Sequence, residues 1–194
     1  MNLITDKSSI GWIVLSMSLV LLSPIFTWGQ DESRTPHDYF MQPPNGELLT
    51  WAHKYHLNHK KFFAQLKAGH YEYALGELLI VLDYLPNHPK ALTLLQVAAP
   101  LAGKPRTVNY RYERALHLYP QHSFTHAQFG RYLTDQGQAE KGIVYLKNAI
   151  GLDPKNGTFY AWLAKAYKKA GKMDLAKQST QKAKELGYRK PGRR

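Results

Sequence analysis

The pattern of apolar, small and turn-forming residues repeats along most of the chain with one fixed period. Glycines mark this period most plainly, and four of them stand 34 residues apart. They are Gly69, Gly103, Gly137 and Gly171. Prolines keep the same step at Pro86, Pro120 and Pro154. A shared period of this length is the signature of a short solenoid, in which similar units stack side by side.

Between these marks, apolar, small and aromatic residues fall at equivalent positions, most completely in residues 157–190. The matching positions there are Tyr160, Leu163, Ala164, Tyr167, Ala176 and Ala183. The pattern resembles the tetratricopeptide repeat family over about 70% of the chain. This resemblance implies an all-α fold, a right-handed superhelical solenoid of about four helix-turn-helix repeats, within a domain at residues 46–190. We expect the repeats at about 55–88, 89–122, 123–156 and 157–190.

The first repeat follows the family pattern only in its second half. Asn58, Lys61 and Gln65 are polar at positions where the family has apolar residues. We therefore expect its first helix to pack in a shifted phase and to begin early, near Glu47. Asn45 is the expected N-cap of that helix, because an asparagine side chain accepts hydrogen bonds from the first turn.

Two prolines change the expected second repeat. Pro100 falls near the end of its first helix, and we expect it to kink or shorten that helix because proline removes one helical hydrogen bond. Pro105 suits the first turn of the next helix, where a missing N–H costs little. The last helix, about 173–186, is rich in polar residues, so we expect it to cap the open end of the solenoid.

Residues 10–28 are almost wholly apolar and predict an N-terminal targeting or anchor helix. Residues 1–29 have two interpretations. They are either a signal peptide, cleaved to leave Gln30 first, or an uncleaved signal anchor whose residues 10–28 contact and span a membrane. Both interpretations predict an extracytoplasmic location, periplasmic, secreted or membrane-anchored. Residues 30–45 are rich in proline and charge without an apolar period, which predicts a linker.

Composition narrows the possible chemistry and partners. The chain contains no cysteine, which excludes disulfides, thiolate metal sites and cysteine nucleophiles. Its net charge is +12 and its pI is about 9.7, so acidic or anionic partners are expected. Residues 191–194 form a basic tail, which we interpret as a solvated end, and we do not expect nucleic acid as a partner.

In the tetratricopeptide repeat family, the first helix of each repeat lines a concave groove that binds extended peptides or partner helices. Carried onto this chain, the resemblance implies a basic groove with interspersed aromatic residues, which suits an acidic peptide with apolar anchors. The implied partner-binding residues are His59, Lys60, Phe63, Lys90, Thr93, Val97, Phe124, Gln128, Arg131, Trp162, Lys165 and Lys169. For Phe124 and Trp162, the alternative is ordinary packing within or between repeats.

We expect no catalytic site, no cofactor and no specific metal site. The sequence has no phosphate-binding glycine loop, no nucleophile elbow and no zinc-protease motif. The spacing of His53, His56 and His59 would allow one shared helix face, and His122 and His126 are four residues apart. Isolated histidines lack a full ligand set, so we interpret them as surface residues.

Together these observations predict a non-enzymatic scaffold or adaptor of the cell envelope. It would bind a partner protein or acidic peptide in the groove and assist the assembly of a complex. One alternative is a binder of anionic polymer or of a membrane surface, driven by total charge. A second alternative is an accessory role in the maturation of a metal or haem protein.

Overall fold

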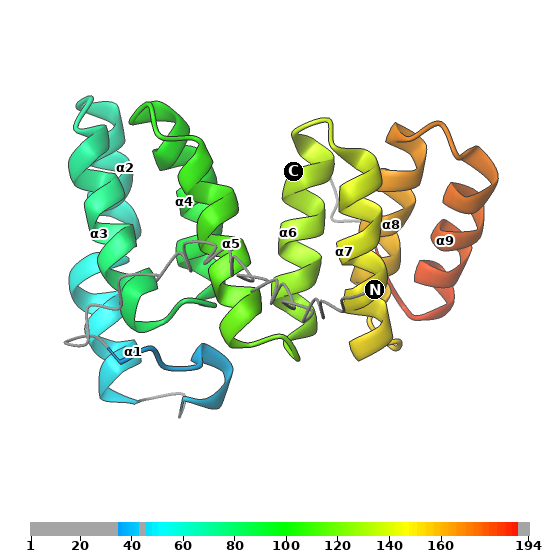
Figure 1. Ribbon diagram of the computed structural model, residues 1–194, viewed down its shortest axis with the longest axis horizontal. Coiled ribbons are helices and arrows are strands. Elements are labelled where there is room, and N and C mark those ends of the chain that lie inside the picture. The colour runs from blue at the N-terminus through cyan, green and yellow to red at the C-terminus, as the bar shows by residue number, and fades with distance from the viewer. Residues whose placement is uncertain (1–34, 43–45, 190–194) are drawn as a thin grey trace, which may run out of the picture. The chain divides into compact units, whose positions relative to one another are not determined.

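The computed structural model describes residues 35–42 and 46–189, and helices joined by short turns account for most of them (Figure 1). No strand occurs in these ranges. The apolar segment at residues 10–28, the proposed cap Asn45 and the basic tail lie outside the described residues. Within the described part of the chain, none of the helices combines the length and the apolar character that crossing a membrane requires.

The helices follow one another across the fold in chain order, ending with α9 at the right of Figure 1. From α4 onward they form regular pairs, in which α4, α6 and α8 begin 34 residues apart. The regular helices are α3 (Tyr71–Tyr84), α4 (Pro89–Leu101), α5 (Arg106–Leu118), α6 (Ser123–Asp135), α7 (Ala139–Leu152), α8 (Gly157–Lys169) and α9 (Met173–Glu185). The family-based expectation of an all-helical repeat fold is confirmed for these residues.

The four periodic glycines close the turns between the paired helices. Their φ angles lie between 70° and 80°, in the left-handed region that residues with a Cβ atom rarely adopt. At each of them the chain leaves one helix and enters the next within about four residues. The period seen in the sequence is therefore the period of these turns.

The first repeat is less regular than the sequence pattern predicts. Helix α1 (Glu47–Trp51) does begin at Glu47, but its N-cap is Gly46 and not the Asn45 that the sequence predicts. It passes into a π-helical turn, η2 (Ala52–His56), and the helix then breaks. Helix α2 (His59–Lys67) starts afresh, because the side chain of Asn58 accepts a hydrogen bond from the backbone N–H of Lys61 at 3.1 Å. The polar residue that spoils the family pattern thus serves as an N-cap.

Pro100 does not shorten its helix, and that part of the expectation is wrong. Helix α4 continues through Pro100 to Leu101 and has 13 residues, as α6 and α8 do. The proline lies in the last turn, where it removes a single helical bond, and its carbonyl accepts a hydrogen bond from Gly103 at 3.0 Å. Pro105 stands one residue before α5, at its N-cap position.

Helices α6 and α7 pack backbone against backbone. A Cβ atom built on Gly142 would lie 2.6 Å from the carbonyl oxygen of Gly130, and one built on Gly130 would lie 2.8 Å from that of Gly142. The equivalent residues of the preceding repeat, Gln96 and Val108, carry side chains. Gln96 uses its amide to donate to the Tyr112 hydroxyl at 2.7 Å.

Two clusters of buried residues form the core, and both include residues of α6. Between α5 and α7 the core is aromatic. The ring of Phe129 stacks on the buried ring of Tyr112 at 4.9 Å, and it also lies 4.6 Å from the ring of Tyr145. Such ring pairs add to the burial energy and fix how successive helix pairs stack.

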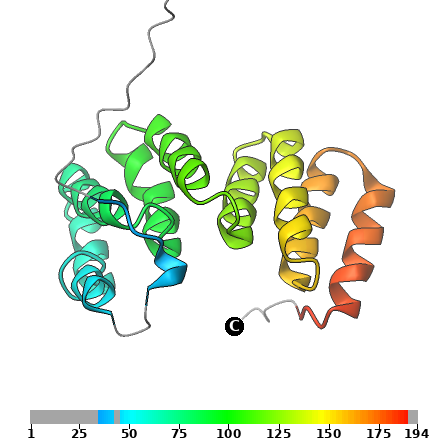
Figure 2. The same cartoon turned by 60° about the horizontal axis from the view of Figure 1, so that its bottom comes forward.

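The described part of the predicted linker packs against the repeats. A short 3-10 turn, η1 (Tyr39–Met41), lies close to the helices of the first repeats (blue in Figure 2). The backbone N–H of His37 donates to the carbonyl of Tyr84 at 2.7 Å, at the end of α3. The chain is thus held to the solenoid before the first helix begins.

Candidate functional site

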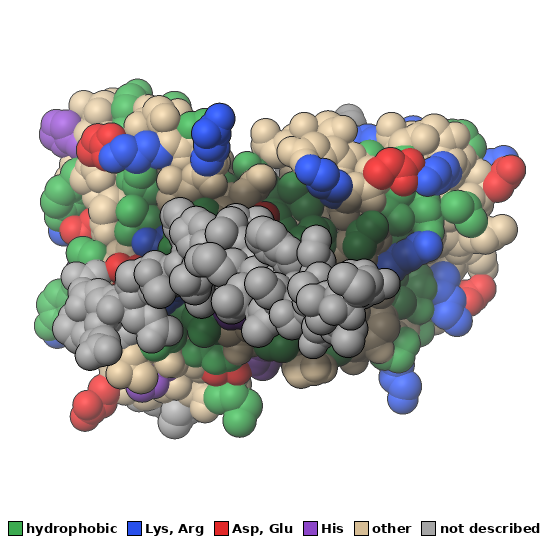
Figure 3. All heavy atoms as spheres, in the orientation of Figure 1, with side chains coloured by type: hydrophobic (Ala, Val, Ile, Leu, Met, Phe, Trp, Pro, Cys, Tyr) green, Lys and Arg blue, Asp and Glu red, His purple; other side chains and the backbone are tan. Residues whose placement is uncertain are grey.

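The predicted partner-binding residues are carried by the first helix of each pair. These are α2, α4, α6 and α8, and we call the surface they form the A-helix face. Helix α6 contacts both α4 and α8, so residues of three repeats come together on this face. On the side of the molecule drawn in Figure 3, Lys and Arg side chains are interspersed with Asp and Glu.

Arg131 and Trp162 form the most distinctive group on the A-helix face. The guanidinium carbon of Arg131 lies 4.8 Å from the centre of the Trp162 ring. Among the described residues, no carboxylate forms an ion pair with Arg131, and the side chain is half-buried. A guanidinium stacked on an aromatic ring keeps its N–H groups in a fixed plane, free to bind a carboxylate in two places.

Trp162, beside Arg131, and its neighbour Phe124 are each packed on one side and exposed on the other. Phe124 and Trp162 are half-buried, with ring centres 6.3 Å apart, and Trp162 lies at the same distance from the buried ring of Phe159. Packing within the repeats, the alternative considered from the sequence, therefore accounts for one side of each ring. The exposed remainder is available as an apolar contact beside Arg131.

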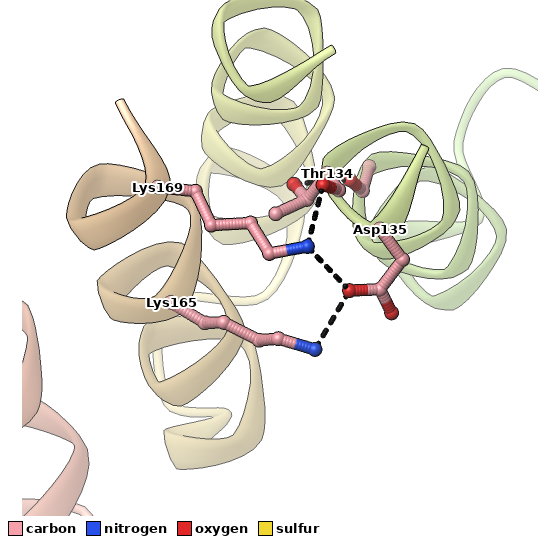
Figure 4. A network of polar contacts seen from close by, with 5 residues as sticks. Thr134, Asp135, Lys165 and Lys169 are labelled. Carbon is pink, nitrogen blue, oxygen red and sulfur yellow. Dashed lines mark hydrogen bonds and ion pairs between the residues drawn. The ribbon is translucent and has the colours of Figure 1, made fainter. Parts of the chain in front are cut away.

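Lys165 and Lys169 are engaged within the chain (Figure 4). Both donate to the same carboxylate oxygen of Asp135, at 2.7 and 3.3 Å, and Lys169 also donates to the carbonyl of Thr134 at 3.0 Å. Burial acts to raise the pKa of Asp135, but hydrogen bonds from the two lysines outweigh it and hold that pKa below its ordinary value. Asp135 thus balances part of the positive charge with which Lys165 and Lys169 were expected to attract an acidic ligand.

Gln128 and Thr93 join two helices of the face. The Gln128 amide donates to the carbonyl of Pro89 at 3.0 Å and to the Thr93 hydroxyl oxygen at 2.9 Å. Gln128 is only 5% exposed, and the Thr93 hydroxyl donates its own hydrogen bond to the Pro89 carbonyl at 2.9 Å. These two predicted binding residues are therefore held inside the joint between α4 and α6.

The remaining predicted residues are at the surface. His59 and Lys60 are exposed, and Phe63 and Val97 are 43% and 45% exposed. The ring of His59 lies 4.5 Å from that of Phe63. Lys90 is exposed too, but it donates to the carbonyl of Leu57 at 3.1 Å, so it also ties α4 to the break before α2.

The histidines that share a helical spacing in the sequence do not share a site. His53 hydrogen-bonds to His88 at 3.2 Å, His56 contacts a carboxylate oxygen of Glu77 at 2.7 Å, and His59 faces Phe63. His126 donates to the carbonyl of Pro120. In residues 35–42 and 46–189, no three metal-ligating side chains gather in one place.

A cleft of about 590 Å³ lies where the turn between α2 and α3 approaches the end of α4. Its lining includes His70, Glu72, Tyr73 and Leu101. None of the predicted partner-binding residues lines it. The A-helix face is a surface of side chains on neighbouring helices, which fits an extended partner better than a small molecule.

These features define a helical repeat protein in which the first helices of successive pairs share one face. The Tetratricopeptide repeat family model matches residues 133–186, which run from the end of α6 to the end of α9. Residues 133–186 therefore match the tetratricopeptide repeat pattern that the sequence predicts. No curated protein matches the sequence.

Solved structures of proteins named MamA resemble the fold. A MamA double mutant of RS-1 is 20% identical, with a TM-score of 0.50 over 73% of this chain and 76% of that chain. A second MamA crystal structure is 20% identical, with a TM-score of 0.50 over 66% and 75%. MamA from Desulfovibrio magneticus RS-1, begun at residue 41, is 21% identical, with a TM-score of 0.49 over 66% and 72%. At these identities the likeness concerns the fold.

Proposed function

We propose that this protein is a non-enzymatic scaffold or adaptor of the cell envelope that binds an acidic segment of a partner protein on its A-helix face. The observation that carries the proposal is Arg131, half-buried against Trp162 and without a carboxylate partner among the described residues. The tetratricopeptide repeat fold supports a role in binding proteins. Assistance in the assembly of a complex is the role we propose for this binding.

The chemistry of the face favours an acidic ligand with an apolar anchor. A ligand carboxylate meets the planar N–H groups of Arg131, and an apolar side chain covers the exposed part of Trp162 and Phe124. A hydrogen bond to a charged group contributes about 1.5–3 kcal/mol, which corresponds to roughly a 10- to 150-fold change in affinity. Arg131 is thus expected to carry a large share of the binding energy.

The envelope location is the second part of the proposal. It rests on the apolar run at residues 10–28, which suits a signal peptide or an anchor. In the anchor interpretation the same run holds the repeats at a membrane surface, where the partner would also be found.

A random peptide display library, selected with the purified full chain, tests the binding proposal. We expect the selected peptides to combine acidic residues with an aromatic or large apolar residue. Arg131→Glu should lower their affinity at least about tenfold, as expected for the loss of a charged hydrogen bond and its replacement by like charge. Trp162→Ala should weaken binding by less, since it removes apolar contact but leaves the guanidinium.

Lys147→Glu provides the matched control for Arg131→Glu. Lys147 is exposed on α7, a helix outside the A-helix face, and the substitution changes the net charge by the same amount. Equal losses in the two variants, together with affinity that falls steeply with salt, would refute binding at Arg131 and favour the binding of anionic surfaces by total charge. Circular dichroism of each variant checks that the helices are intact.

A further inference from the structure

The edge of the solenoid, where the turns between repeats lie, holds a second group of polar and aromatic side chains. Asn87 and His88 lie in the turn between α3 and α4, and His122 lies in the turn between α5 and α6. His88 and His122 are 34 residues apart and occupy equivalent positions. We call these three residues the edge site, and residues 37–40, which lie across it, the strap.

Asp38 makes the polar contacts at the centre of the strap. One carboxylate oxygen accepts from the Asn87 side-chain amide at 2.7 Å and from the backbone N–H of Phe40 at 2.9 Å. The other oxygen pairs with the Nε2 atom of His122. A single carboxylate of the strap is therefore bound by side chains from two successive turns.

The side-chain amide of Asn87 both donates a hydrogen bond to the strap and accepts one from it. While its nitrogen donates to Asp38, its oxygen accepts from the backbone N–H of Tyr39 at 2.8 Å. Asn87 is fully buried, and these are the hydrogen bonds the structure gives its side chain. Without the strap, this donor and this acceptor would exchange their protein partners for water, so a segment that offers the same groups can replace the strap.

The next two residues of the strap each meet a histidine of the edge site. The ring of Tyr39 lies 4.5 Å from that of His88, and the ring of Phe40 stacks on that of His122 at 4.8 Å. The edge site thus recognises a carboxylate, a stretch of backbone and two consecutive aromatic rings. This combination matches an aspartate followed by two aromatic residues.

The strap lies at the surface of the repeats, and of its residues Tyr39 packs against the core. Its turn η1 contains no buried residue, and Phe40 and His122 keep partly exposed faces. Intramolecular hydrogen bonds contribute little net free energy, and ordering a few residues costs a comparable amount. Such a segment stays in place mainly because it is tethered nearby, which gives it a high effective concentration.

We propose that the edge site is a peptide-recognition site for an Asp-aromatic-aromatic segment, filled in cis by the chain's own strap, and that the strap exchanges with the same segment supplied as a free peptide. The site is separate from the A-helix face and does not depend on the function proposed for that face. Its occupation holds the residues before α1 against the first two repeats.

A labelled peptide of residues 35–42, titrated into the full chain, tests this exchange. In the variant Asp38→Ala the cis strap loses its carboxylate, so the peptide should bind at least tenfold more tightly than to the wild-type chain, whose site is filled. Asp174→Ala, which removes an exposed carboxylate of α9, should bind the peptide as weakly as the wild type does.

A second peptide guards against effects of the substitution on folding. It carries alanine in place of the aspartate and should bind the Asp38→Ala chain at least tenfold more weakly than the natural peptide, since Asn87 and His122 then lack their acceptor. Equal binding of the natural peptide to the wild type and to Asp38→Ala would overturn the proposal. So would equal binding of the two peptides, or no binding of the natural peptide to Asp38→Ala.

Discussion

His88 makes the stability of the fold sensitive to acid in a way that one substitution can isolate. The residue is 1% exposed, and its Nδ1 atom accepts a hydrogen bond from the backbone N–H of Ala91, at the start of α4. A neutral histidine that accepts at Nδ1 carries its proton on Nε2, which therefore donates to His53. A second proton would have to enter at Nδ1, where it would face the Ala91 N–H.

Burial, reinforced by the neighbouring His53, lowers the pKa of His88 from 6.5 to about 3. Since the folded-state pKa lies below the unfolded one, the unfolded chain takes up a proton between these values while the folded chain does not. Acid therefore destabilises the fold through this residue, and the effect begins as the pH falls through 6.5. Each pH unit in this window costs about 1.4 kcal/mol, so lowering the pH from 7 to 5 removes about 2 kcal/mol.

The matched variant is His88→Asn, because asparagine already occupies the equivalent N-cap position at Asn156 and accepts from Thr158 there. Urea unfolding at pH 7 and at pH 5 gives the loss of unfolding free energy for each protein. We expect the wild type to lose about 2 kcal/mol more than His88→Asn. The exposed His117 provides a control, and His117→Asn should behave as the wild type does. Equal pH dependence in the wild type and His88→Asn would refute the reasoning.

Three further predictions address packing, charge and location. Gly142→Ala should lower the free energy of unfolding, measured by heat or urea, by about 2–3 kcal/mol, because its Cβ atom would lie 2.6 Å from the Gly130 carbonyl oxygen. The control Gly151→Ala should not destabilise the protein, since nothing lies within 4 Å of its Cβ position. Asp135→Ala should change the free energy of unfolding by less than about 1 kcal/mol, since its ion pairs are exposed. It should also strengthen the binding of acidic peptides severalfold, because it frees Lys165 and Lys169, and unchanged or weaker peptide binding would contradict this. Fractionation of the source cells should place the protein outside the cytoplasm, and a cytosolic protein would contradict the envelope proposal. N-terminal sequencing should find either Gln30 as the first residue or an uncleaved chain.

The regular part of the fold could be predicted because its signal is local and repeated. A glycine at a turn is required by its left-handed φ, and each turn of this kind recurs at one spacing, as at Gly137 and Gly171. The repeat pattern fails to predict the structure where a residue has a local role, such as capping a helix, that the pattern does not include. Asn58 interrupts the first repeat because it caps α2, and Pro100 is tolerated because it lies in a last turn.

The candidate site was harder to predict, because its residues depend on partners in other helices. Gln128 occupies a position that faces a ligand in the family pattern, but the approach of α4 and α6 buries it. Asp135 pairs with two lysines from the next repeat, across 30 and 34 positions, and balances part of their charge. The strap follows no period, and Asp38 meets its partners at separations of 49 and 84 residues, which no local pattern encodes.

The most direct test of partner binding on the A-helix face is site-specific photo-crosslinking in the source cells. A photoreactive residue in place of Val97, on α4, samples the face, and one in place of Val144, on α7, provides a control of similar size and exposure, at 45% and 57%. We predict a discrete adduct with a protein partner from position 97 that disappears when Arg131→Glu is added. The same adduct from position 144, or an adduct at position 97 that survives Arg131→Glu, would contradict the account.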